Sequence, residues 1–104
     1  MDTKLFKLVA DEVARQGATI DLIPSENIAP PEVLELLGSP LVNKYSEGYP
    51  GKRYYPGNTI YDEIEELAKS RALETFKLSD KEWAVNVQAY SGSPANQAIY
   101  AALS

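Results

Sequence analysis

A run of glycines, prolines and tyrosines near the middle of the chain sets the strongest limit on its fold. The segment 44–57, KYSEGYPGKRYYPG, holds three glycines and two prolines, so neither a helical nor a strand repeat can run through it. Four of the chain's seven tyrosines lie there, together with Glu47 and three cations. We therefore predict a loop, here named the tyrosine loop, whose aromatic residues favour a contact surface. The alternative is a turn that packs on its own domain.

The composition fits one small domain and excludes several kinds of chemistry. The 104 residues are 44% hydrophobic, which is ordinary for a globular chain, and the net charge of −5 argues against a nucleic-acid partner. The absence of cysteine and histidine excludes disulfides, thiol nucleophiles, the usual zinc sites and the commonest general base. No stretch approaches the roughly 20 apolar residues of a membrane span. We expect a soluble, intracellular protein with no membrane partner and no bound metal.

Apolar spacing predicts two helices before the tyrosine loop. The first helix is expected to begin at a cap on Asp2 or Thr3 and to stop at Gly17. The second should run over residues 31–37, with Gly38 just beyond its end.

The longest predicted helix follows the tyrosine loop. It should begin at Asn58 or Thr59 and reach about Lys77. Glu65 and Lys69 are spaced to form an ion pair along it. Its buried side is expected to hold Ile60, Ile64, Leu67, Ala68, Ala72 and Phe76.

The end of the sequence predicts a strand, a polar glycine turn and a helix. Residues 83–87 alternate as a strand does, and a helix is expected from about Ala95. Such a unit normally continues to a parallel partner strand. We therefore expect the chain to be the first part of a larger α/β protein.

Three polar segments are candidate sites. Ser91, Gly92 and Ser93 precede a predicted helix and could offer N–H groups and hydroxyls to a phosphate, although a plain helix cap is an equal alternative. Residues 25–27 form a polar turn that on spacing alone is more often structural. Glu47 is a candidate for proton transfer, because partial desolvation among tyrosines would favour its protonated form near neutral pH.

Taken in order, these segments resemble a known family. The blocks IPSEN at 23–27, NKYSEGYPGKRYY at 43–55, NVQ at 86–88 and SGSPAN at 91–96 resemble the N-terminal part of the serine hydroxymethyltransferases. The resemblance implies the N-terminal portion of a fold-type I, α/β, pyridoxal-phosphate-dependent transferase, and a cytoplasmic location.

The resemblance also implies a reaction and an assembly. The family moves the serine hydroxymethyl carbon to tetrahydrofolate and leaves glycine, in a homodimer whose subunits share their active sites. Residues 1–57 would form an N-terminal helix, arm and active-site loop. Residues 58–104 would begin the large cofactor-binding domain.

Substrate roles follow by matching motif positions. The resemblance puts Ser25 near the substrate carboxylate and Glu47 between the substrate hydroxyl and folate, as a proton-transfer group. Tyr54 and Tyr55 would line the folate and substrate sides, which suits flat aromatic rings. Glu47 and Tyr55 are the expected catalytic residues.

Cofactor roles follow in the same way. The resemblance implies that Tyr45 reaches the cofactor phosphate of the neighbouring subunit. Ser91, Gly92 and Ser93 match the phosphate-binding turn.

Two positions depart from the family pattern, and several family residues are missing. Pro24 stands where the family more often has alanine, and Pro56 where it more often has glycine. The cofactor-binding lysine, the stacking histidine, the aspartate at the pyridine nitrogen and the substrate-binding arginine belong to later sequence. We therefore expect the 104 residues alone to be inactive. The alternative is a stand-alone, non-catalytic binding or dimerisation module from the same family.

Overall fold

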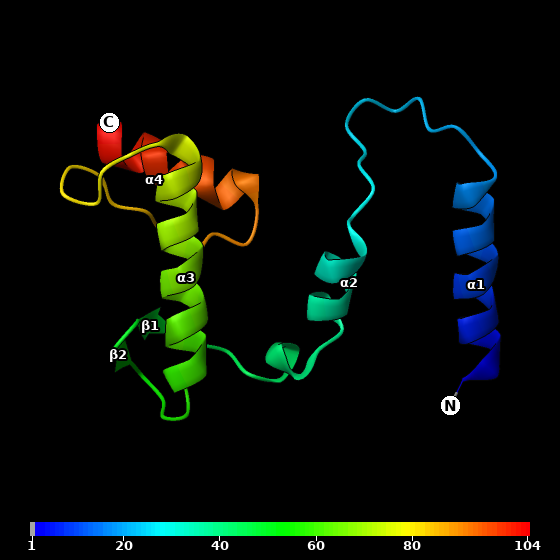
Figure 1. Cartoon of the computed structure of the whole chain (residues 1–104), viewed down its shortest axis with the longest axis horizontal. Coiled ribbons are helices and arrows are strands. Elements are labelled where there is room, and N and C mark those ends of the chain that lie inside the picture. The colour runs from blue at the N-terminus through cyan, green and yellow to red at the C-terminus, as the bar shows by residue number, and fades with distance from the viewer. Residues whose placement is uncertain (1) are drawn as a thin grey trace. The chain divides into compact units, whose positions relative to one another are not determined.

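The computed structural model describes residues 2–104, and the chain divides into two compact units between Asn43 and Lys44. The tyrosine loop therefore belongs to the same unit as the long helix that follows it, while the functional division at residue 57 stays a prediction. The elements, in order, are α1 (Thr3–Gly17), α2 (Pro31–Leu37), the 3-10 helix η1 (Pro40–Asn43), β1 (Gly48–Tyr49), β2 (Lys52–Arg53), α3 (Thr59–Phe76) and α4 (Gly92–Leu103) (Figure 1).

The first unit confirms both predicted helices. Asp2 caps α1, since its carboxylate accepts the N–H groups of Lys4 and Leu5 at 3.1 Å. The short helix α2 spans the predicted residues, with Gly38 as its C-cap. The structure adds η1, which begins at Pro40. Proline fits this position because the first turn of a helix does not need its N–H group.

The tyrosine loop contains a small hairpin that the sequence prediction missed. β1 and β2 pair antiparallel, with Gly48 opposite Arg53 and Tyr49 opposite Lys52. The backbone has φ +99° at Gly48 and +72° at Gly51, values that residues with a Cβ rarely adopt. The glycines that interrupt a longer strand repeat are thus the residues that permit this tight turn.

The long helix α3 begins and ends as predicted, but the side that was expected to be buried is exposed. Asn58 is its N-cap and Lys77 its left-handed C-cap. The predicted buried side is wrong, because Ile60 is 60% and Phe76 74% exposed. The described residues supply no layer to cover that face.

The predicted pair along α3 is also wrong. Glu65 pairs with Arg53 of the hairpin, and Lys69 pairs with Glu66 instead. The Glu65 carboxylate, which helical spacing pairs with Lys69, instead binds an arginine from outside the helix.

The predicted strand over residues 83–87 does not form, and α4 begins earlier than expected. A strand needs a partner for its N–H and C=O groups, and the part of the chain described here contains none beside this segment. The helix α4 starts at Gly92, three residues before the predicted Ala95, with Ser91 as its N-cap.

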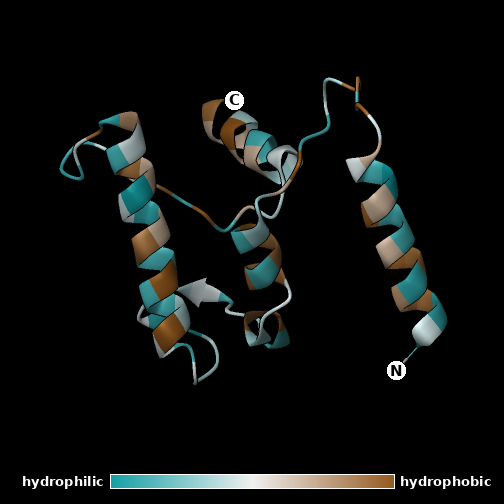
Figure 2. Ribbon diagram, turned by 45° about the vertical axis from the view of Figure 1, so that its right-hand side comes forward, coloured by the Kyte–Doolittle hydropathy of each residue, from teal (hydrophilic) through white to brown (hydrophobic). Residues whose placement is uncertain are grey.

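Apolar side chains are not gathered into a core. Across residues 2–104 no hydrophobic residue is buried, and Asn58, 4% exposed, is the residue that is buried as a whole, backbone included. Figure 2 shows hydrophobic and hydrophilic residues alternating along α1 and α3. Within these residues, no helix combines the length and apolar character needed to cross a membrane. An unfinished core of this kind predicts marginal stability.

Candidate functional site

A buried arginine joins the hairpin to α3. The Arg53 side chain is 4% exposed and donates hydrogen bonds of 2.7 Å from Nε to Asp62 and 2.6 Å from Nη2 to Glu65. Asp62 also accepts the Gly51 N–H at 2.9 Å. The Gly51 N–H, followed by the Arg53 guanidinium, holds the pKa of Asp62 below its ordinary value. Glu65 and then Asp62 raise the pKa of Arg53. Asp62 and Arg53 therefore both keep their charges.

The same arginine fixes the backbone around Glu47. Nη1 of Arg53 donates to the carbonyl oxygens of Ser46 and Gly48, each at 2.7 Å. The Tyr54 N–H donates to the Glu47 carbonyl at 3.2 Å. Three consecutive carbonyls, one on each side of Glu47 and its own, are therefore held by β2 and the residue after it.

A groove of about 690 Å³ lies along this part of the second unit. Two of the predicted site residues, Tyr45 and Glu47, line this groove together with residues of the segment that leads to α4. Gln88 of that segment donates from Nε2 to the Gly48 carbonyl at 2.6 Å. The groove is lined by Tyr45, Ser46, Glu47, Tyr61, Ile64, Glu65, Ala68, Val87, Gln88 and Tyr90.

The predicted aromatic residues are partly brought together. The rings of Tyr45 and Tyr55 meet edge to face, with centroids 5.5 Å apart and planes at 84°. The Tyr55 carbonyl accepts the Asn58 side-chain N–H at 2.9 Å. Tyr54 does not line the groove and is 78% exposed.

Glu47 lies at the surface of this chain. Its residue is exposed, although it lines the groove beside Tyr45. The desolvation expected from its tyrosine neighbours is therefore not provided by these residues alone. Any burial of the carboxylate has to come from another surface.

The start of α4 has the features of an anion site. Ser91 is its N-cap in extended conformation, and its side chain makes no cap hydrogen bond. A Cβ built on Gly92 would meet no atom within 4 Å, so the backbone is open to a close approach. N–H groups at a helix start, hydroxyls of Ser91 and Ser93, and the helix dipole together suit a phosphate.

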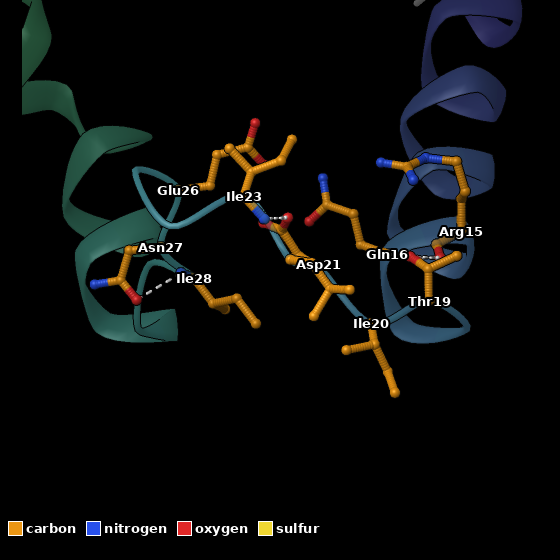
Figure 3. Close-up of a pocket in the computed structure, with 10 residues that line it drawn as sticks. Arg15, Gln16, Thr19, Ile20, Asp21, Ile23, Glu26, Asn27 and Ile28 are labelled. Atoms are coloured by element: carbon orange, nitrogen blue, oxygen red, sulfur yellow. Dashed lines mark hydrogen bonds between the residues drawn. The ribbon is translucent and has the colours of Figure 1, made fainter.

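Ser25 belongs to the first unit. It lies in the predicted turn, where the Glu26 N–H donates to the Ile23 carbonyl at 3.1 Å. A pocket of about 800 Å³ lies beside this turn, and Glu26 and Asn27 contribute to it while Ser25 does not (Figure 3).

Sequence reasoning missed the anchoring role of Arg53, Asp62 and Gln88. Arg53 was counted only as one cation of the tyrosine loop. Its carboxylate partners lie nine and 12 residues further along, beyond any helical spacing rule that starts from a loop residue. The available signal was a single arginine between Gly51 and Gly57, followed by a helix with acidic residues in its first turns.

Comparison with known proteins gives one consistent result. The family model for serine hydroxymethyltransferase matches residues 1–104. The chain is 55% identical to serine hydroxymethyltransferase 4 of Arabidopsis thaliana, over 99% of the chain and 22% of that protein. It is 54% identical to the cytosolic serine hydroxymethyltransferase of Candida glabrata (98% and 22%) and 52% identical to the mitochondrial one of Saccharomyces cerevisiae (98% and 21%). The chain thus spans about a fifth of the length of these curated relatives.

Proposed function

Because the chain belongs to the serine hydroxymethyltransferase family, we propose that it is the N-terminal segment of an enzyme that interconverts serine and tetrahydrofolate with glycine and 5,10-methylenetetrahydrofolate. The observation that carries the proposal is the family match over the whole chain, joined to a groove that both Tyr45 and Glu47 line. The proposed architecture is a fold-type I homodimer with shared active sites. The proposed location is the cytoplasm, as for the cytosolic relative of Candida glabrata; the mitochondrial relatives make that compartment the alternative.

The start of α4 would hold the phosphate of pyridoxal phosphate. Ser91 and Ser93 would donate from their hydroxyls, and the N–H groups of the first turn would donate beside the open Gly92. The Tyr45 hydroxyl would donate a hydrogen bond to the phosphate of the cofactor bound in the neighbouring subunit. When bound, the cofactor would supply the electron sink for removal of the hydroxymethyl group from serine.

Glu47 would hold and move the proton between the substrate hydroxyl and the folate. A carboxylate suits this task when it is partly enclosed, and we propose that the neighbouring subunit and the folate cover it. Tyr54 and Tyr55 would form aromatic walls on the folate and substrate sides, with Tyr55 catalytic beside Glu47. Ser25 would bind the substrate carboxylate from its turn.

The competing function is a stand-alone binding or dimerisation module. The exposed apolar side chains of α1 and α3 would suit a surface that needs a partner. The same exposure follows equally from a segment whose covering layers belong to the same enzyme. The high identity to catalytic relatives over nearly the whole chain favours the enzyme segment.

A chimera tests the enzyme role directly. The chain would replace the matching segment of the Candida glabrata cytosolic enzyme, and tetrahydrofolate-dependent release of glycine from serine would be measured. We expect activity in the chimera and a loss of about 10²- to 10⁴-fold in Glu47→Gln, the range for a removed acid–base group. Glu74→Gln, the same change at an exposed position of α3, is the matched control.

The isolated chain provides the complementary test. It should release no glycine from serine and should retain no pyridoxal phosphate after borohydride reduction, since it lacks the family's cofactor lysine. Turnover by the 104 residues would refute the expected inactivity. A chimera as active in Glu47→Gln as in its parent would refute the role of Glu47.

A further inference from the structure

The Arg53 side chain is more enclosed than either of its carboxylate partners. It is 4% exposed, against 24% for Asp62 and 14% for Glu65. A buried guanidinium is costly unless its donors are paired. Here the two carboxylates neutralise it on one side, while Nη1 remains available for backbone carbonyls.

The two carbonyls that Nη1 binds are those of Ser46 and Gly48, which directly flank Glu47. The Glu47 carbonyl itself accepts the Tyr54 N–H. The backbone that carries the Glu47 side chain therefore has little freedom to rotate or slide. Arg53 also binds Asp62 and Glu65, so this backbone is tied to α3, an 18-residue helix.

We propose that Arg53 is a positioning residue for Glu47: it transmits the fixed position of α3 to the peptide that carries the proton-transfer carboxylate. This inference rests on the proposed function of Glu47. Glu47 is exposed, and within residues 2–104 its carboxylate makes no hydrogen bond or ion pair. Its place is therefore set by the backbone that carries it.

The geometry requires arginine and not merely a cation. The planar guanidinium presents donors in a fixed fork, so one group can reach Asp62, Glu65 and two carbonyls in different directions. A lysine ammonium is a compact point charge on a flexible stem. Arg53→Lys would keep the charge but could not hold the carbonyls and both carboxylates at once.

The test is a double-mutant comparison in the active chimeric holoenzyme. Arg53→Lys is made in the parent and in the Glu47→Gln background, and kcat, KM for serine, cofactor content and exchange of the Tyr54 amide are measured. In the parent we expect kcat to fall about 10- to 100-fold, the scale for a displaced catalytic group, with cofactor content unchanged and faster exchange at Tyr54. In the Glu47→Gln background we expect a fall of less than about threefold, because coupled residues are not additive.

Controls separate this role from general structure. Arg71→Lys is the same exchange at an exposed position of α3 and should leave all four readouts unchanged. If Arg53→Lys does not fold, Glu65→Gln, which weakens the anchor and keeps an acceptor, is compared in the same two backgrounds.

Three results would count against the proposal. An equal loss from Arg53→Lys in both backgrounds would mean that Arg53 acts without Glu47. Full activity in Arg53→Lys alongside a large loss in Glu47→Gln would overturn this inference alone and leave the proposed function standing. No loss in Glu47→Gln would overturn the role of Glu47 and, with it, the positioning role of Arg53.

Discussion

Replacing Gly48 with alanine is expected to open the β1–β2 hairpin. A Cβ at this position would lie 2.4 Å from the Lys52 carbonyl oxygen and 3.2 Å from the Arg53 Cα. Both are backbone atoms of the opposing strand, so neither can turn aside as a flexible side chain would. The substitution also forces alanine into φ +99°.

The expected cost comes from two separate sources. The backbone conformation costs roughly 1–3 kcal/mol for a residue with a Cβ, and an unrelieved steric contact adds roughly 1–3 kcal/mol. Gly51→Ala is the matched control, because φ is +72° there but a Cβ would meet no atom within 4 Å. The difference between the two variants therefore isolates the contact.

Hydrogen exchange of the Tyr54 amide, which bonds to the Glu47 carbonyl, reports opening of the hairpin in the chimeric enzyme. Since 1.4 kcal/mol corresponds to tenfold, Gly48→Ala should exchange about 5- to 150-fold faster than Gly51→Ala. Equal rates in the two variants, both clearly slower than in an unfolded peptide, would refute the steric argument.

Two further predictions concern α1. The Arg15 side chain, with two hydrogen bonds of 2.7 Å, and then Gln16 lower the pKa of the Glu12 carboxyl from 4.5 to about 2. A lowered pKa means that the ionised carboxylate stabilises the helix above pH 4.5 and that this contribution is lost as the pH falls toward 2. A carbon-detected NMR titration should find the Glu12 midpoint well below 4.5 and shifted upward in Arg15→Met; identical midpoints would contradict the cause. Asp2→Ala should destabilise α1 by about 0.5–2 kcal/mol while Asp2→Asn keeps the cap, as measured by Cα chemical shifts of the first turns, and an equal loss in both variants would argue against capping.

Local signals predicted the helices well. Asp2, Pro31 and Lys77 lie at or beside the ends of their helices as expected, because caps and breakers act within one turn of the residue that supplies them. The polar turn at Ser25 was also predicted correctly. Each of these features is decided by neighbours in sequence.

Predictions that needed a distant partner failed. The strand at residues 83–87 lacks a neighbouring strand among the residues described, and the expected buried face of α3 lacks a covering layer. Glu65 was assigned to Lys69 by helical spacing, whereas the structure gives it to Arg53. The candidate site followed the same division: Tyr45 and Glu47 could be chosen from the motif, but Arg53 could not be recognised as their anchor.

The amino-acid sequence alone predicted the ends of α1, α2 and α3, the place where the chain must turn, and the polar groups that are available for chemistry. It did so because capping, glycine conformation and proline geometry are local properties. The contacts of Arg53 with Asp62, Glu65 and the carbonyls around Glu47 could not be predicted in this way and arise from the folding of the hairpin against α3. Those contacts join residues from separate elements, and the enclosure that makes an ion pair specific exists only after the hairpin lies against α3.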